Sequence, residues 1–265
     1  MSYFKKSLGQ NFLIDSNIIK KITSITKIAG EDVLEIGPGS GNLTEQIIKQ
    51  KPKSMILIEK DQKLANLLKS KFKNYDNISI INKDFLKLEL EKLIKTNTLV
   101  FGNLPYNVSS QILIKFLRLK NYPVIFSKLI FMFQKEVGNK IKAKVGEKDY
   151  GRLAIITKFK FNVTKCFDIS NNCFFPRPKV NSTVLLFKPK KKLNFKIKNI
   201  KNLEKITQIF FSGKRKMINK PLKNIFRNSV EIISKLNLNL SMRPGEVSEN
   251  DYYKIVYLFE KIGDR

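Results

Sequence analysis

The chain has 265 residues, 42% of them hydrophobic, which is enough for one large folded domain with a small appendage. Its 51 Lys and Arg against 22 Asp and Glu give a formal net charge of +29, which indicates a polyanionic partner, RNA or DNA ahead of an anionic membrane. There is no His and there are only two Cys, so Ser-His-Asp catalysis, His-ligated metals and a disulfide framework are excluded.

The first residues are polar and basic, and no apolar run approaches the length of a membrane span. We therefore expect a soluble cytoplasmic protein without a metal site. Only seven of the basic residues are Arg, and Asn and Ile are abundant. An alternative explanation for part of the positive charge is an AT-rich genome, which favours Lys, Asn and Ile without any selection for binding.

Short apolar runs alternate with helical patterns through the first half of the chain. The runs predict strands at residues 32–36, 54–58, 78–81, 98–101 and 129–133, with helices at 43–49 and 61–72 between them. Continuous apolar strands separated by helices are typical of an α/β fold with a parallel sheet covered on both faces. Two further strands are expected, at Ile155–Phe161 and Ser182–Phe187.

The composition changes after Lys188. From Lys188 to Arg227 there are fourteen Lys or Arg and one acid, Glu204, a net charge of +13 in forty residues. Helical spacing at 203–211, 221–228, 230–236 and 252–262 predicts a small all-helical C-terminal domain. We therefore divide the chain into a catalytic domain, residues 1–190, and a helical, basic RNA-binding domain, residues 191–265.

Within the second domain, six side chains are candidates for contacts with RNA phosphates: Lys214, Arg215, Lys216, Lys220, Lys223 and Arg227. The alternative is a solvated Lys-rich helix surface. Because Pro221 interrupts this stretch, the sequence does not show whether all six share one face.

A glycine-rich turn, EIGPGSG at residues 35–41, follows the first predicted strand and opens a helix. Gly37 and Gly39 let the backbone turn sharply and approach a ligand closely. Glu59 and Asp84 follow the next two strands, at the same edge of the sheet. A carboxylate at Glu59 can accept both ribose hydroxyls of a nucleoside, and Asp84 can accept the exocyclic amine of adenine. The structural alternative is a strand–turn–helix corner with helix-capping acids.

The spacing of the glycines distinguishes between two candidate ligands, a dinucleotide and S-adenosylmethionine. A dinucleotide loop reads G-x-G-x-x-G and seats a pyrophosphate at the helix N-terminus, whereas this loop reads G-x-G-x-G after Glu35. A carboxylate there would repel a pyrophosphate but suits a ligand that carries an ammonium and a sulfonium. The loop therefore favours S-adenosylmethionine.

The tetrad Asn103-Leu104-Pro105-Tyr106 follows the fourth predicted strand, at the same edge. The Asn103 side-chain oxygen and the Leu104 carbonyl could accept the N–H groups of adenine N6 and stabilise the positive charge that develops on the nitrogen. Tyr106 offers a ring on which an extruded base could lie. No strong base is required, which agrees with the absence of His. The alternative is an Asn-Pro turn with a buried Tyr.

The sequence resembles the small-subunit ribosomal RNA adenine N6,N6-dimethyltransferases over nearly its whole length. Stretches that carry the resemblance occur in order at Ser7–Leu13 (SLGQNFL), Val33–Gly41, Ile58–Asp61, Val100–Ser110 (VFGNLPYNVSS), Met132–Val137, Tyr150–Leu153, Phe174–Ser182 (FFPRPKVNS), Phe210–Lys216 and Arg243–Ser248. Lys60, often apolar in the family, and Asn181, often Asp, depart from its pattern.

The resemblance implies a Rossmann-like S-adenosylmethionine-dependent methyltransferase sheet. It implies that Asn11 and Leu13 close over the cofactor and that four residues contact it: Gly37, Glu59, Asp84 and Asn103. Phe174 would be a second aromatic that sandwiches the target base against Tyr106; from the residues alone, core packing is the alternative. The family transfers four methyl groups, two to each of two adjacent adenosines in a hairpin loop near the 3′ end of 16S ribosomal RNA. We expect a monomer that acts on immature small subunits.

Three other functions stay open. The first is the large-subunit methylase of macrolide resistance, against which the Phe174–Ser182 and Arg243–Ser248 stretches argue. The second is a DNA adenine methyltransferase, which would normally carry a sequence-reading domain. The third is an assembly factor whose main role is to bind immature small subunits.

Overall fold

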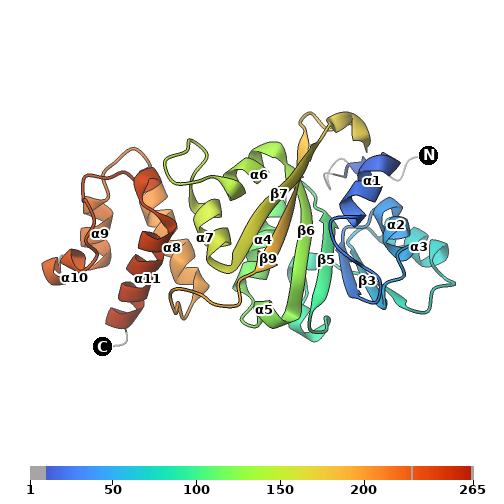
Figure 1. Ribbon diagram of the computed structural model, residues 1–265, viewed down its shortest axis with the longest axis horizontal. Coiled ribbons are helices and arrows are strands. Elements are labelled where there is room, and N and C mark those ends of the chain that lie inside the picture. Colours follow the sequence, from blue (N-terminus) through green and yellow to red (C-terminus); the bar gives the residue numbers. More distant parts are fainter. Residues whose placement is uncertain (1–9, 228, 264–265) are drawn as a thin grey trace. The chain divides into compact units, whose positions relative to one another are not determined.

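The computed structural model describes residues 10–227 and 229–263, which form two compact units (Figure 1). The first unit extends to Gly138 and resumes over Val163–Pro189, and the second contains Asn139–Asn162 and continues from Lys190. The second unit thus takes in residues 139–162, which the sequence assigned to the catalytic domain. Within the described residues, no helix is both long enough and apolar enough to cross a membrane.

The first unit is built on a seven-stranded mixed sheet with the order β4-β3-β2-β5-β6-β9-β7. Its strands are β2 (Asp32–Ile36), β3 (Ser54–Glu59), β4 (Ile78–Asn82), β5 (Thr98–Asn103), β6 (Phe126–Gln134), β7 (Phe161–Ile169) and β9 (Ser182–Pro189). The five strands from β4 to β6 run parallel, as expected, whereas β9 is antiparallel to β6. Their order places the carboxyl ends of β2, β3 and β5 side by side, with Ile36 opposite both Ile58 and Gly102.

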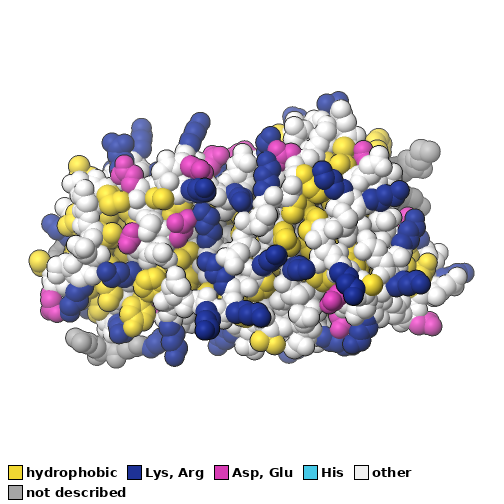
Figure 2. Space-filling view, in the orientation of Figure 1, with side chains coloured by type: hydrophobic (Ala, Val, Ile, Leu, Met, Phe, Trp, Pro, Cys, Tyr) yellow, Lys and Arg dark blue, Asp and Glu magenta, His cyan; other side chains and the backbone are white. Residues whose placement is uncertain are grey.

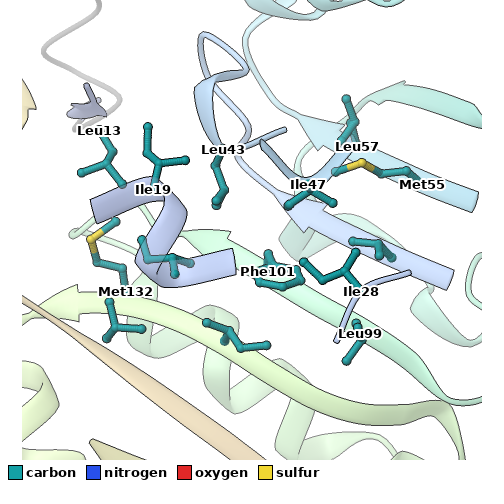
Figure 3. Close-up of a cluster of buried hydrophobic side chains, with 14 of the residues drawn as sticks. Leu13, Ile19, Ile28, Leu43, Ile47, Met55, Leu57, Leu99, Phe101 and Met132 are labelled. Carbon is teal, nitrogen blue, oxygen red and sulfur yellow. The ribbon is translucent and has the colours of Figure 1, made fainter. Parts of the chain in front are cut away.

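Six helices belong to the chain segments around this sheet: α1 (Ser16–Thr23), α2 (Asn42–Ile48), α3 (Gln62–Lys71), α4 (Ser109–Arg118), α5 (Tyr122–Ile125) and α6 (Lys135–Lys142). On one face, Ile19, Leu43 and Ile47 pack with Met55 and Phe101 in a continuous apolar cluster (Figure 3). Successive residues of a strand face opposite sides of a sheet, so burial on both faces explains why these strands read as unbroken apolar runs.

The opposite face is packed with aromatic rings. Phe116 of α4 lies with its ring centroid 4.9 Å from that of Phe126, 5.4 Å from that of Phe131 and 5.5 Å from that of Phe85. Its side chain is completely buried. The helix that follows the Asn103–Tyr106 tetrad is therefore anchored to the sheet through this ring.

A second, two-stranded sheet pairs β1 (Phe12–Leu13) with β8 (Phe174–Phe175), in antiparallel register. Leu13 lies opposite Phe174, and both side chains belong to the buried apolar cluster. Phe12 lies opposite Phe175 on the other face of this ribbon. Because the two strands are about 160 residues apart in sequence, no local sequence pattern predicts that they pair.

The second unit is helical, with α7 (Arg152–Lys160), α8 (Ile200–Phe211), α9 (Asn219–Ile225), α10 (Val230–Ser234) and α11 (Glu249–Gly263). The expected C-terminal helices are present. Pro221 lies in the first turn of α9, where its missing N–H costs no helical hydrogen bond.

The predicted strand at Ile155–Phe161 is wrong. Residues 152–160 form α7, which packs against α8 and α11, and β7 begins at Phe161. Ala154, Ile155 and Phe159 are all buried, so the helix has no polar face. An apolar run without a polar face has no readable period and cannot be told from a buried strand.

Removing the Phe116 ring should destabilise the first unit strongly. Phe116→Ala leaves a cavity among three aromatic rings, and the free energy of unfolding should fall by about 3–5 kcal/mol. Val124→Ala, whose side chain is 60% exposed, is the control and should change it by no more than about 0.5 kcal/mol. Urea unfolding measures both, and equal values would contradict the packing described.

Candidate active site

A pocket lies at the carboxyl ends of β2, β3 and β5, and the glycine-rich turn forms one wall of it. Gly39 has a φ of +58° and would place a Cβ 2.8 Å from the Phe12 ring. Gly41, with a φ of +83°, begins α2 and lies against Leu68 and Phe72 of the α3 segment. Only glycine fits both the backbone conformation and the space at Gly39, so the turn and the Phe12 ring are in close contact.

Glu59 holds this turn in place. It ends β3 and is buried, with Oε2 accepting the Gly39 N–H at 3.1 Å and Oε1 accepting the Asp61 N–H at 2.8 Å. Burial raises the pKa of the Glu59 carboxyl, and these backbone donors partly oppose the rise. Each carboxylate oxygen has further lone-pair sites, so Glu59 can also accept hydrogen bonds from a ligand in the pocket that it lines.

Glu35 supplies a second carboxyl to the pocket from the end of β2. Complete burial raises its pKa to about 8, although the Thr44 hydroxyl donates a 2.7 Å hydrogen bond to its Oε2 and the nearby Glu59 raises it further. The group is therefore largely protonated at neutral pH in the free protein, and a cation bound nearby would favour its ionised form.

The Asn103–Tyr106 tetrad also lines the pocket, next to the glycine turn. The Asn103 Nδ2 donates a 2.9 Å hydrogen bond to the Asn11 carbonyl, which leaves its Oδ1 as an acceptor. The Tyr106 hydroxyl lies 2.6 Å from the Ser182 Oγ at the start of β9, and burial raises the pKa of this phenol. Tyr106 is therefore held by a partner and stays neutral at physiological pH.

The structure brings most of the predicted site residues together. The following line the pocket: Asn11, Leu13, Gly37, Gly39, Glu59, Asn103, Leu104 and Tyr106. Among the catalytic and cofactor-binding candidates that the structure describes, Asp84 and Phe174 are the two that do not line it. The roles of all these residues remain predictions.

Asp84 follows β4 and begins the short helix Phe85–Lys87. It accepts the Leu86 N–H at 2.9 Å, and its Oδ2 lies 2.9 Å from the Lys60 Nζ. Partial burial opposes ionisation, but Lys60 and the Leu86 N–H outweigh it, so the pKa of Asp84 is lowered. Lys60 lines the pocket, so Asp84 is connected to the pocket through its ion pair with Lys60.

Phe174 is only 3% exposed and belongs to the apolar cluster, whereas its neighbour Phe175 is 66% exposed. A role for Phe174 against the target base would require its ring to leave the core.

Sequence reasoning did not assign Phe12, Ser182 or Lys60 to the site. Phe12 and Ser182 lie within stretches that carried the family resemblance, which was the available signal. Their contacts with Gly39 and Tyr106 join distant parts of the chain. Among the described residues, no group of three or more Asp, Glu, Cys or His could hold a metal ion.

All six candidate RNA contacts are exposed and lie in the second unit: Lys214, Arg215, Lys216, Lys220, Lys223 and Arg227. Lys220 and Lys223 are three residues apart on α9 and therefore share a face. The Lys214 Nζ donates to the Lys148 carbonyl at 2.8 Å. Figure 2 shows Lys and Arg distributed across the visible face, with Asp and Glu sparser. The positive charge is thus spread beyond this segment.

The parallel sheet, the glycine turn and the asparagine tetrad at one edge define a Rossmann-like methyltransferase. A solved structure of a dimethyladenosine transferase from Plasmodium falciparum is similar, with a TM-score of 0.80 and 27% identity over 95% of this chain and 98% of that one. The family model described as "Ribosomal RNA adenine dimethylase" matches residues 1–261, and the chain belongs to that family.

Two relatives have the name ribosomal RNA small subunit methyltransferase A. The one from Pelagibacter ubique is 48% identical over 258 residues, which is 97% of each chain. The one from Malacoplasma penetrans is 39% identical over 97% of this chain and 92% of the relative. The protein is therefore a ribosomal RNA adenine dimethyltransferase, and the alternative of a DNA adenine methyltransferase is excluded.

Gly39→Ala should weaken the binding of S-adenosylmethionine. The added Cβ overlaps the Phe12 ring, so the ring or the turn must move from the position in which both line the pocket, and losing about 1 kcal/mol of ligand contacts would lower the affinity about fivefold. Gly30→Ala is the matched control, because Gly30 also has a positive φ, +77°, but nothing lies within 4 Å of its added Cβ. Calorimetric titration of both variants tests this; equal affinities would show that the close contact is unimportant.

The affinity for S-adenosylmethionine should rise with pH and level off above about 8, the pKa of Glu35 in the free protein. A bound cation lowers that pKa, so binding releases a proton below pH 8, and affinity rises by at most about tenfold per pH unit. Glu35→Gln keeps an acceptor for Thr44 but cannot ionise. The amino group of the cofactor titrates in the same way with either protein, so only the contribution of Glu35 differs between them. Identical pH profiles of variant and parent would therefore refute this role.

Proposed function

We propose that the protein transfers methyl groups from S-adenosylmethionine to N6 of two adjacent adenosines in a hairpin loop near the 3′ end of 16S ribosomal RNA. It acts as a monomer on immature small subunits in the cytoplasm. The names of its relatives as small-subunit methyltransferases support this substrate. The observation that carries the proposal is that the glycine turn and the asparagine tetrad line one pocket.

The residues of the pocket fit this cofactor. Glu59 offers free lone pairs to ribose hydroxyls, and Glu35 offers a carboxyl that ionises beside a cation. The close approach of Gly39 to Phe12 forms a narrow cradle that a side chain at position 39 would fill. When bound, S-adenosylmethionine supplies an electrophilic methyl group.

Asn103 and Leu104 act on the amino group of the adenine. The Asn103 Oδ1 and the Leu104 carbonyl accept hydrogen bonds from the N6 amino group and stabilise the positive charge that develops on its nitrogen. The bond from Asn103 Nδ2 to the Asn11 carbonyl orients that amide before the substrate arrives, so little reorganisation is needed.

Tyr106 contributes its ring rather than its hydroxyl. Its raised pKa and its bond to Ser182 keep the phenol protonated and in place, which suits a surface for an extruded base and not a proton acceptor. The Lys and Arg side chains exposed on the second unit supply phosphate contacts that hold the RNA.

The direct test is to incubate the protein with labelled S-adenosylmethionine and undermethylated small subunits, and to map the product by RNA mass spectrometry. The proposal expects dimethyladenosine at two adjacent positions near the 3′ end of the small-subunit RNA. Label in a parallel reaction with large subunits instead, or binding to small subunits without methylation, would favour one of the alternatives.

Asn103→Ala should slow the chemical step by about 100-fold or more, the usual effect of removing one preorganised polar contact to developing charge. Single-turnover methylation of small subunits measures this rate, and calorimetry measures S-adenosylmethionine binding separately. Asn107→Ala is a control from the same wall of the pocket, outside the tetrad. A parent-like rate in a folded Asn103→Ala protein would refute the role of this amide.

A further inference from the structure

Phe175 stands out among the aromatic side chains. Of the Phe residues that the structure describes, it alone is exposed, at 66% of its surface. Leaving so large an apolar ring in water is unfavourable, because burying it would stabilise the protein or a complex by about 1.5–3 kcal/mol. The exposed ring is therefore available to pack against a partner.

The ring lies at the rim of the methyltransferase pocket. Phe175 is the direct cross-strand partner of Phe12, and residues opposite each other in an antiparallel pair have Cβ atoms about 4.5–5.5 Å apart on one face. Phe12 lines the pocket and touches the glycine turn. Phe175 thus extends the apolar wall of the pocket outward to solvent.

The segment that follows Phe175 makes hydrogen bonds that connect it to the same site. The Asn171 side-chain Nδ2 donates to the Pro178 carbonyl at 3.1 Å, and the Asn171 backbone N–H donates to the Asn181 Oδ1 at 3.1 Å. The next residue, Ser182, contacts the Tyr106 hydroxyl. The segment that carries Phe175 is therefore connected to Tyr106 through Ser182.

The charges around Phe175 favour a nucleic acid over a protein or lipid partner. Arg177 and Lys179 are exposed in the same segment. From residue 169 to 203 the sequence contains no Asp or Glu. In the folded chain the Asp15 Oδ2 lies 3.7 Å from the Cys173 Sγ, so one carboxylate from another segment approaches this one. Within the segment itself, an exposed aromatic ring with basic neighbours is the combination that stacks a base while the cations contact its phosphates.

We propose that Phe175 is a stacking surface for an RNA base next to the methylated adenosine, and that it contributes to substrate binding and not to methyl transfer. This inference rests on the proposed function. It assigns to Phe175 a role separate from that of Tyr106, which lines the pocket where the target base reacts, and from that of the buried Phe174.

The test measures KM and kcat for undermethylated small subunits with the parent, Phe175→Ala, Phe175→Leu and Phe175→Tyr. Losing one base–ring stack should raise the KM of the Ala variant about tenfold or more, with kcat and S-adenosylmethionine affinity unchanged. The Leu variant should behave like the Ala variant, because it is apolar without a flat ring. The Tyr variant should return the KM to within about twofold of the parent.

Val180→Ala is the matched control, an apolar side chain 44% exposed in the same segment, and its KM should equal that of the parent. Thermal unfolding confirms that each variant is folded. An unchanged KM in Phe175→Ala overturns the stacking role of Phe175 and leaves the proposed function standing. A parent-like KM in Phe175→Leu does the same, and would indicate an apolar contact with a ribosomal protein. A parent that leaves small-subunit RNA unmethylated overturns the proposed function, and the inference with it.

Discussion

The carboxylate of Glu59 ties together the two loops on which the pocket depends. Burying a carboxylate is costly unless hydrogen bonds compensate, and here the N–H groups of Gly39 and Asp61 supply them from opposite sides. The glycine turn is thereby bound to the end of β3, close enough to Phe12 that any side chain at position 39 would collide with its ring. A single buried group thus shapes the cofactor wall of the site and remains available to accept ligand hydrogen bonds.

The tetrad that lines the pocket gains its rigidity from distant parts of the chain. Asn103 is oriented by the Asn11 carbonyl, and Tyr106 by Ser182 at the start of the antiparallel strand β9. Asn11 precedes the parallel core in the chain and Ser182 follows it, so the core positions the tetrad and segments on either side of it in sequence orient its side chains. This preorganisation explains how amino-group methylation can proceed in a chain without His, because the chemistry needs fixed acceptors more than a strong base.

Under the proposed function, the large positive charge would contribute to RNA recognition at two levels. Lys and Arg spread over the surface generate a general attraction for a polyanion (Figure 2), which speeds encounter without selecting a site. Specific placement needs groups that are both positioned and distinctive, and the proposed role of Phe175, with the exposed Arg177 and Lys179 in the same segment, would supply them. Salt would screen the general attraction and leave base stacking largely intact.

The sequence by itself determined the parallel core and most of the pocket. The apolar runs, the glycine spacing, Glu59 and the Asn103–Tyr106 tetrad are local signals, and they converge because the carboxyl ends of parallel strands meet at one edge of a sheet. Only the tertiary structure decided that residues 152–160 are a helix, that Phe174 is buried while Phe175 is exposed, and that the pKa of Glu35 is about 8. The first two depend on segments far away in the chain, since α8 and α11 pack against α7 and β1 pairs with β8. The third depends on how the chain around Glu35 is buried, with Thr44 of the next helix, α2, hydrogen-bonded to it. Local periodicity contains no information about such contacts, because burial is a property of the whole packed chain.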